Sequence, residues 1–294
     1  MKDILLLVNR HLRIYFSSWT NIFFTLFSNL ISIAVYLLFL FNNSVSSIRE
    51  YAPIDQADNV SILMLLFLIS GQIMVMVISA SLANTDIIIK DTQYTGSDMS
   101  VWPISKTKIM ISYIIQTVII TAAFSLITLV VGLSYIYISY NYYLSISIIT
   151  QVVGIIITSS IFASLIAVLL TSMMKNARSY GSFSTIINTL SGFLLGIYVP
   201  LGVLPNFVQK IVLVNPYFNY MYLFRNVMMK DIIEITFEKV PMEIKNNVLE
   251  VYGLLINKNN QIFDIEHLSM VMAITFVVVL TVTLVVFRKK QIVR

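Results

Sequence analysis

Hydrophobic and polar positions along the chain separate into long blocks instead of alternating every few residues. Five blocks contain no Asp, Glu, Lys or Arg, and they cover residues 14–48, 59–85, 109–174, 179–209 and 268–287. A helix that spans a membrane needs about 20 apolar residues, so each block is long enough for at least one span. The pattern therefore predicts an integral membrane protein whose spans are helices.

The third block is 66 residues long, so it must fold back on itself. A Tyr-rich stretch at 134–143 is the natural place for that reversal. The predicted fold is an all-α polytopic membrane protein in which residues 1–294 form a single transmembrane domain. Its six expected transmembrane helices cover residues 20–41, 60–83, 109–134, 145–172, 181–204 and 268–287.

Residues 2–19 predict an amphipathic helix ahead of the first span. At the helical period, one face is apolar and aromatic and the opposite face is basic and polar. The apolar face holds Ile4, Leu5, Val8, Leu12, Tyr15, Phe16 and Trp19, and the polar face Lys2, Asp3, Asn9, Arg10, Arg13 and Ser17. Such a helix suits the headgroup layer of a membrane. We therefore expect it to lie at the cytoplasmic interface, with membrane lipid as a direct partner.

Composition and charge agree with a membrane location. The chain is 58% hydrophobic and 11% charged, with a mean hydropathy of +0.87, whereas about a quarter of the residues in soluble domains are charged. Placing both termini in the cytoplasm puts twelve Lys and Arg residues inside and seven outside. This matches the usual excess of basic residues in cytoplasmic loops. The net charge of +5 therefore reflects orientation, and nucleic acid is not an expected partner.

The residue types needed for catalysis or metal binding do not converge in this sequence. The only histidines, His11 and His267, fall on opposite sides of the predicted membrane, and there is no Cys. The predicted spans lack ionisable groups, which disfavours proton-coupled transport. No P-loop motif of the form G-x4-G-K-[ST] occurs. We expect no catalytic, cofactor-binding or metal-binding residues, and energy for transport would have to enter from a separate subunit.

The stretch after the fifth predicted span interrupts an apolar run. Pro200 and Pro205 remove backbone donors near the outer end of that span. Asn215 and Pro216 end an apolar segment, 206–214, that is too short to cross a membrane at about 1.5 Å per residue. Broken backbone at membrane depth needs protein or water around it. We expect a re-entrant outer gate at 205–225 and an extracellular insert at 226–267; a plain surface loop is the alternative.

Two segments carry a resemblance to a known family. The first runs from Gly96 to Trp102-Pro103-Ile104-Ser105-Lys106-x-Lys108-Ile109. The second is Gly196-x3-Pro200-x3-Leu204-Pro205, followed by Asn215-Pro216-x3-Tyr220-x4-Arg225. With the entry helix and six spans, they resemble the ABC-2 type (type V exporter) membrane subunits of bacterial ABC transporters. The first segment departs from the family pattern in having Asp98 early and Val101-Trp102 where leucines are usual.

The resemblance implies the permease of an ATP-driven exporter in a bacterial cytoplasmic membrane. Two permease subunits, identical or different, would pair around a pathway, and two copies of an ABC ATP-binding subunit would bind ATP and Mg. Segment 84–108 would be the coupling loop, with Asp91, Gly96, Asp98, Trp102, Pro103, Ile104, Ser105 and Lys106 as coupling residues. Pro200, Leu204, Pro205, Asn215, Pro216 and Tyr220 would form the outer gate. Phe23, Phe27, Gln72, Asn188 and Ser191 are the pathway candidates.

The cargo is less constrained than the family. Apolar, aromatic spans with few polar groups favour a lipophilic or amphipathic molecule, such as a drug, an antibiotic or a hydrophobic peptide. A lipid-linked polysaccharide or teichoic acid is the rival cargo. A non-transporting accessory or immunity subunit is the alternative from another class. Phe23 and Phe27 are equally compatible with lipid contact, and Gln72 with a hydrogen bond between helices.

Overall fold

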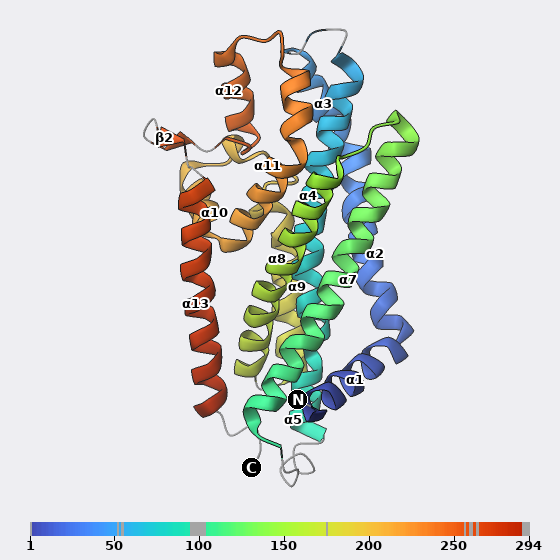
Figure 1. Cartoon of the computed structure of the whole chain (residues 1–294), viewed down its shortest axis with the longest axis vertical. Helices are drawn as coiled ribbons and strands as arrows, with labels where there is room; N and C mark the ends of the chain where they lie inside the picture. The colour runs from blue at the N-terminus through green and yellow to red at the C-terminus, as the bar shows by residue number, and fades with distance from the viewer. Residues whose placement is uncertain are drawn as a thin grey trace.

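The structure is a computed structural model that describes residues 2–51, 53, 56–94, 104–174, 176–255, 257–258, 261–262 and 265–289. These residues form an elongated bundle of helices (Figure 1). The strands among them are β1 (Asn257–Lys258) and β2 (Gln261–Ile262), which pair antiparallel. The expected all-helical architecture is confirmed apart from this short ladder.

The helices follow one another with short connections. The first half of the chain contains α1 (Lys2–Ser17), α2 (Trp19–Val35), the π-helical turn η1 (Tyr36–Leu40), α3 (Phe41–Arg49), α4 (Ala57–Asn84), α5 (Asp86–Tyr94) and α7 (Lys106–Tyr140). The second half contains α8 (Ile146–Met173), α9 (Ala177–Leu194), the 3-10 turn η3 (Leu201–Val203), α10 (Asn206–Val214), α11 (Pro216–Thr236), α12 (Met242–Val251) and α13 (Ile265–Lys289).

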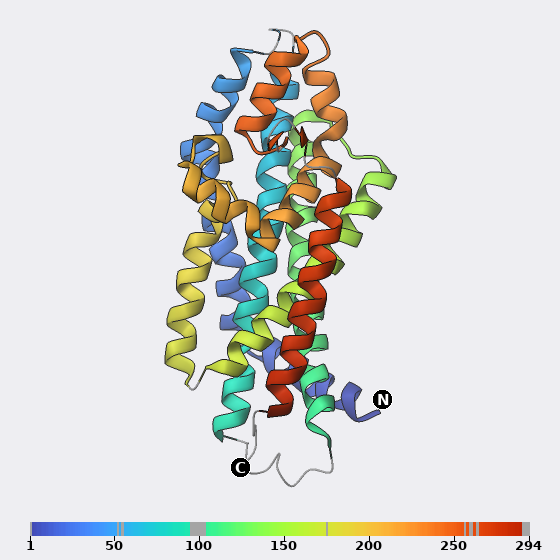
Figure 2. The same ribbon diagram turned by 90° about the vertical axis from the view of Figure 1, so that its left-hand side faces the viewer.

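Helix α4 is the centre of the bundle. Its side chains are buried on all sides from Val60 to Leu82, because α2, α7, α8, α9 and α11 all pack against it. A helix that is apolar around its whole circumference is expected to be buried in this way. Figure 2 shows α4 running through the interior of the bundle, parallel to its long axis.

Four helical segments of the described chain are long and apolar enough to cross a membrane. They are Trp19–Arg49, Ala57–Thr92, Lys106–Tyr140 and Ile146–Met173. Helix α9 has 18 residues and lies outside this set, and α13 carries a shorter apolar stretch, Met270–Val286. A multi-pass membrane protein is therefore confirmed, whereas the count of six spans and the re-entrant hairpin stay predictions.

The two ends of the bundle carry different elements. Helices α1 and α5 and the C-terminal turns of α13 lie at one end, which we call the α1 end (Figures 1 and 2). Helices α3 and α12 and the last turns of α11 lie at the opposite end, called the α12 end. The start of α1 and the end of α13 therefore share one side of the bundle, as the predicted topology requires. Which end faces the cytoplasm stays a prediction from the distribution of Lys and Arg.

Two expected helix boundaries were wrong. The helix expected at 181–204 is α9, which ends at Leu194. Gly196 adopts a φ of 63°, and the N–H of Ile197 donates to the carbonyl of Gly192, which closes the helix. This is a left-handed C-terminal cap. In the same way α7 continues through most of the expected reversal at 134–143 and turns only at Asn141, whose φ is 50°.

The segment after α9 forms η3, α10 and α11 in succession. Figure 1 shows α10 level with the first turns of α13, and α11 climbs from there to the α12 end. The Oδ1 of Asn215 accepts a hydrogen bond from the N–H of Tyr217 at 3.1 Å, and Pro216 occupies the first turn of α11. This Asn-Pro pair combines two standard signals for a helix start. Helix α11 then runs unbroken across 225–226, where the expected gate meets the expected insert.

Candidate functional site

A groove with a volume of about 650 Å³ lies between α2, α4, α9 and the turn after α9. Its apolar walls include Val35, Phe39, Val75 and Phe193. Its polar lining comes from Ser28, Ser32, Ser79, Asn188, Thr189, Ser191 and Tyr198. No residue lining the groove is Asp, Glu, Lys or Arg. The groove is therefore a neutral, mostly apolar surface with a strip of hydroxyl and amide groups.

Hydrogen bonds between helices hold this polar strip in place. The hydroxyl of Ser79 on α4 donates to Oδ1 of Asn188 on α9 at 3.2 Å. On the opposite wall, the hydroxyls of Ser32 and Tyr198 lie 2.5 Å apart and share a hydrogen bond. The side-chain amide of Gln72 on α4 donates to the Ser32 hydroxyl at 2.9 Å. These contacts satisfy polar groups that would otherwise be unpaired inside an apolar bundle.

The five pathway candidates separate into three sets. Asn188 and Ser191 line the groove, with Ser191 almost fully buried and donating to the backbone carbonyl of Asn188 at 2.7 Å. Gln72 reaches the groove only through Ser32 and makes the interhelical hydrogen bond noted above. Phe23 and Phe27 stack on each other at 5.3 Å on the exposed side of α2 and are outside the groove lining.

A second cluster joins α1, α5 and α7 at the α1 end. The guanidinium of Arg10 donates to both carboxylate oxygens of Asp91, at 3.0 and 2.9 Å. The Tyr113 hydroxyl donates to the same carboxylate at 2.8 Å, and the ring of His11, 4.6 Å away, stacks on that of Tyr113. His11 is completely buried and Asp91 almost so. We call Arg10, His11, Asp91 and Tyr113 the α1 latch.

The surroundings of the α1 latch are apolar on one side and exposed on the other. Ile104 packs against the apolar cluster that contains Leu7 and Met110. On the exposed side, Nζ of Lys108 lies 2.6 Å from Oδ2 of Asp3. The hydrogen bond and the charge of Lys108 lower the pKa of Asp3. The α1 helix is thus attached to the start of α7 by one exposed ion pair and to α5 by one buried ion pair.

The coupling candidates have different positions. Asp91 is held in the α1 latch, Ile104 is half-buried, and Ser105 and Lys106 are exposed at the start of α7. Gly96, Asp98, Trp102 and Pro103 lie outside the described residues. Whether these residues contact a partner subunit stays a prediction. Asp91, with a relative exposure of 5%, offers almost no surface to such a partner.

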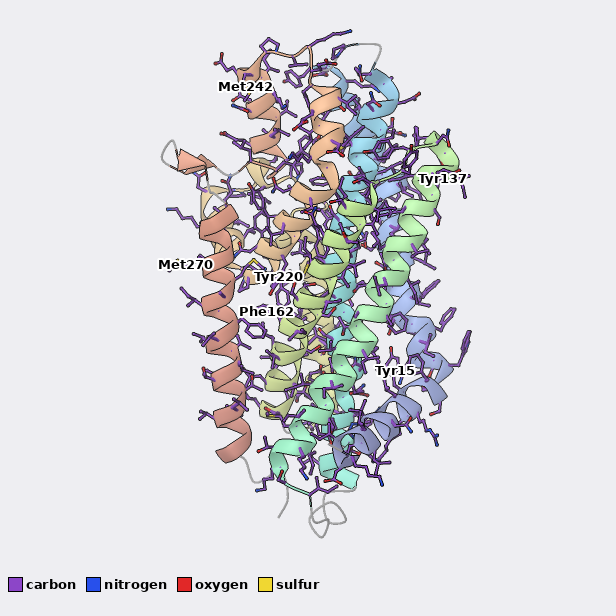
Figure 3. All side chains as sticks on the ribbon, in the orientation of Figure 1. Tyr15, Tyr137, Phe162, Tyr220, Met242 and Met270 are labelled. Atoms are coloured by element: carbon purple, nitrogen blue, oxygen red, sulfur yellow. The ribbon has the colours of Figure 1, made fainter. Side chains whose placement is uncertain are left out.

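The outer-gate candidates pack mainly inside the chain. Tyr220 is buried, and its ring lies 5.5 Å from that of Phe162 on α8; Figure 3 shows these two side chains close together between the helices. Leu204 is half-buried, and its carbonyl accepts from Gln209 at 2.8 Å. Pro200 is half-buried and Pro205 exposed, immediately before η3 and α10 respectively. The structure brings these residues into one region, and their role as a gate stays a prediction.

Arg225 is the anchor of that region. Its side chain is fully buried, and its guanidinium lies 3.6 Å from the ring centre of Phe67 on α4. It donates to the carbonyl of Gly196 at 3.2 Å and to that of Tyr252 at 3.4 Å. A guanidinium over an aromatic face is a favourable cation–π arrangement. One side chain therefore ties α11 to the core, to the turn after α9 and to the end of α12.

Several of these residues were missed at the level of sequence. Thr25, Asn29 and Ser32 are the buried residues of α2 and recur at helical spacing, which marks the face of α2 that packs inward. That spacing was readable in advance. Tyr198 had no such signal, because its position depends on where α9 ends. Among the described residues, no three His, Cys, Asp or Glu side chains come together in a group that could hold a metal ion.

Comparison with known proteins adds the family. A family model described as ABC-2 family transporter protein matches residues 58–286, which includes α4 through most of α13. No curated protein matches the chain. The match extends over well over half of the sequence and agrees with the membrane-spanning bundle described above. Membrane subunits of this family work with an ABC ATP-binding subunit. The chain therefore belongs to the ABC-2 family of transporter membrane proteins.

Proposed function

We propose that this permease exports a lipophilic or amphipathic cargo, and that the groove between α2, α4 and α9 is its half of the pathway. The observation that carries this proposal is the chemistry of the groove lining, which is apolar and uncharged with a narrow polar strip. Ligand sites of this kind bind mostly by apolar contact and orient the ligand with a few hydrogen bonds. A charged cargo would have no partner there, and burying an unpaired charge is strongly unfavourable.

The same lining favours a lipophilic cargo over a polysaccharide. A sugar chain carries a hydroxyl on almost every ring carbon, and each one would need a partner once it leaves water. The groove offers five hydroxyls from Ser and Thr, one from Tyr and one amide, and several of these already bond to one another. A lipid-linked polysaccharide or teichoic acid is therefore the second candidate.

Pairing of two permeases would enclose the groove. Its helices carry large apolar side chains that the single chain leaves exposed, including Phe39 beside α2 and Ile186, Leu190 and Phe193 on α9. A contiguous exposed apolar surface marks contact with lipid or with another protein. In the proposed assembly this surface faces a second permease, identical or related, and the pathway runs between the two grooves.

ATP enters this scheme through the α1 end. We assign that end to the cytoplasm of a bacterial cell, where segment 84–108 docks on an ABC subunit that binds ATP and Mg. Movement of α5 then passes through the Arg10–Asp91 pair to α1 and, across Ser18, to α2 on the groove wall. The proposed outer gate at 205–225 closes the opposite end.

Transport in inside-out vesicles tests the proposal. The full chain is purified from its native membranes together with whatever ABC ATPase accompanies it, and both are reconstituted. We expect ATP-dependent accumulation of a neutral fluorescent amphiphile and stimulation of ATP hydrolysis by it. Asn188→Leu should reduce accumulation, whereas the matched control Thr185→Val, on an exposed part of α9 outside the groove, should not.

Each alternative gives a different result in that experiment. Accumulation of a lipid-linked oligosaccharide without accumulation of the amphiphile would support the second cargo. An accessory subunit would co-purify with a complex and accumulate neither substrate. Equal accumulation by Asn188→Leu and the unaltered protein would remove the groove from the pathway even if transport itself is observed.

A further inference from the structure

A second cavity, with a volume of about 360 Å³, lies between α2, α4 and α7. It shares no lining residue with the groove and lies on the other side of α2. Its walls are almost entirely apolar, and the partly exposed Leu30, Val131 and Tyr135 form its rim. Since α2 and α7 are both long enough to span a membrane, the rim opens toward the lipid.

Two amide side chains break the apolar lining. Asn29 on α2 is 7% exposed and Gln72 on α4 is 1% exposed, and both line the cavity. The nitrogen of Asn29 donates to the Thr128 hydroxyl at 3.1 Å, and the nitrogen of Gln72 donates to the Ser32 hydroxyl at 2.9 Å. Oδ1 of Asn29 and Oε1 of Gln72 are buried and have no hydrogen-bond partner.

The orientation of Asn29 follows from its neighbour. The hydroxyl of Thr128 has a single hydrogen, which it donates to the backbone carbonyl of Phe124 at 3.1 Å. Thr128 can therefore only accept from Asn29, so the nitrogen of Asn29 must face Thr128 and its oxygen must be the free atom. An unpaired carbonyl oxygen inside a membrane protein is unfavourable unless a ligand or water satisfies it.

We infer that this cavity binds one neutral lipid alcohol from the bilayer, whose hydroxyl donates to the free oxygens of Asn29 and Gln72. The two free groups are both acceptors, so the ligand must supply a donor. An ionised fatty acid or a phosphate has only acceptor oxygens and no partner there. A hydrocarbon chain fits the apolar walls but leaves both oxygens unpaired. The chemistry thus selects a long apolar chain that ends in an uncharged donor.

This site is independent of the proposed transport function, because binding needs neither ATP nor a partner subunit. Its two acceptors differ in what else they support. Gln72 also holds Ser32, which lines the groove, whereas Asn29 contacts only Thr128 on the far side of α2. Asn29 is therefore the residue to alter in a test, since its replacement leaves the groove intact.

Photolabelling of the purified full-length protein in lipid nanodiscs tests the inference. The probe is a C16 alcohol with a diazirine in its chain, compared with its methyl ether, which accepts but cannot donate, and with the matching alkane. We expect the alcohol to label α2 and α7 about threefold to tenfold more than the ether, the range that one net hydrogen bond supports. Asn29→Leu should reduce the alcohol to the level of the ether.

Two further variants keep the test decisive. Thr128→Val removes the partner of Asn29 but keeps its free oxygen, so the preference for the alcohol should persist. Leu30→Trp fills the cavity from its rim and should abolish labelling at this site by all three probes. Each variant is first checked for an unchanged elution profile and thermal unfolding midpoint. Equal labelling by alcohol and ether, as expected for an ordinary acyl chain or a bound water, overturns the inference.

Discussion

The guanidinium of Arg10 holds both carboxylate oxygens of Asp91, at 3.0 and 2.9 Å, and so joins α1 to α5 across 81 positions of the chain. A two-pronged contact of this kind fixes orientation as well as distance. The carboxylate is almost fully buried and also accepts from Tyr113 on α7. Movement of α5 relative to the bundle must therefore move α1 or break this contact.

Replacing Arg10 with Met is expected to lower the free energy of unfolding by roughly 1.5–3 kcal/mol, the usual range for a hydrogen bond to a charged group. The reason is that Asp91 keeps its charge in a buried place without its main partner. Arg10→Met combined with Asp91→Leu should be closer to the original stability than Arg10→Met alone, because the pair is then replaced by apolar contact. Denaturant titration of the protein in detergent measures both.

A single variant separates the role of charge from that of geometry in this pair. Arg10→Lys keeps the charge but cannot donate to both oxygens in one plane. We expect its stability to lie between those of the unaltered protein and Arg10→Met, with faster hydrogen exchange in the backbone of α1. Identical exchange in all three proteins would mean that the pair does not hold α1 to the bundle.

The ion pair between Asp3 and Lys108 provides the contrasting case on the same helix. Both side chains are more than 40% exposed, and exposed pairs contribute little because water and salt screen them. Asp3→Asn should therefore leave stability almost unchanged, and the small difference should disappear at high salt. The lowered pKa of Asp3 means that its contribution is present above the pKa of the unfolded carboxyl and is lost as the pH falls through the folded value. Thermal unfolding from neutral to acidic pH should show this only without Asp3→Asn.

The contrast between these pairs shows what the sequence could predict. The charge-free blocks predicted the four long spans because a membrane requires uninterrupted apolar runs, and this requirement is visible in one dimension. The helical periodicity of residues 2–17 predicted α1 as a helix. It could not predict which face of α1 packs on protein. The buried face is centred on Leu7, His11 and Tyr15, whereas Leu5 and Phe16 of the expected apolar face stay exposed.

The candidate site was predictable to a similar extent. Asn188 and Ser191 stood out as polar residues in an apolar block, and both line the groove. Ser32 and Tyr198 come together only because α9 ends at Leu194 and the chain turns back at Gly196. That turn depends on one glycine with a positive φ, and the Pro residues downstream had favoured a later end. Long-range contacts made by such turns have no signature in the local pattern.

Arg225 supports a third prediction, which concerns the region expected to form the outer gate. Arg225→Met should destabilise the protein by roughly 2–4 kcal/mol, because it leaves the carbonyls of Gly196 and Tyr252 unpaired and removes the contact with Phe67. Arg225→Lys should have a smaller effect, since an ammonium can still donate to one of them. Limited proteolysis of 226–255 together with thermal unfolding measures the loss. The matched control is Lys230→Met, an exposed position on the same helix.

Glycine substitutions give the last prediction, because two glycines of this chain should respond in opposite directions. A Cβ on Gly202 would lie 2.8 Å from the Cα of Val251, so Gly202→Ala must push η3 away from the end of α12. Backbone cannot move aside as a side chain can, and overpacking of this kind costs roughly 1–3 kcal/mol. Gly154, within α8, has no atom within 4 Å of the added carbon. Gly154→Ala should therefore stabilise the protein by roughly 0.5–1 kcal/mol, the usual gain for Ala over Gly in a helix. Thermal unfolding of both variants in one detergent decides the matter, and a lower midpoint for Gly154→Ala would contradict the close packing assigned to η3 and α12 as the special feature.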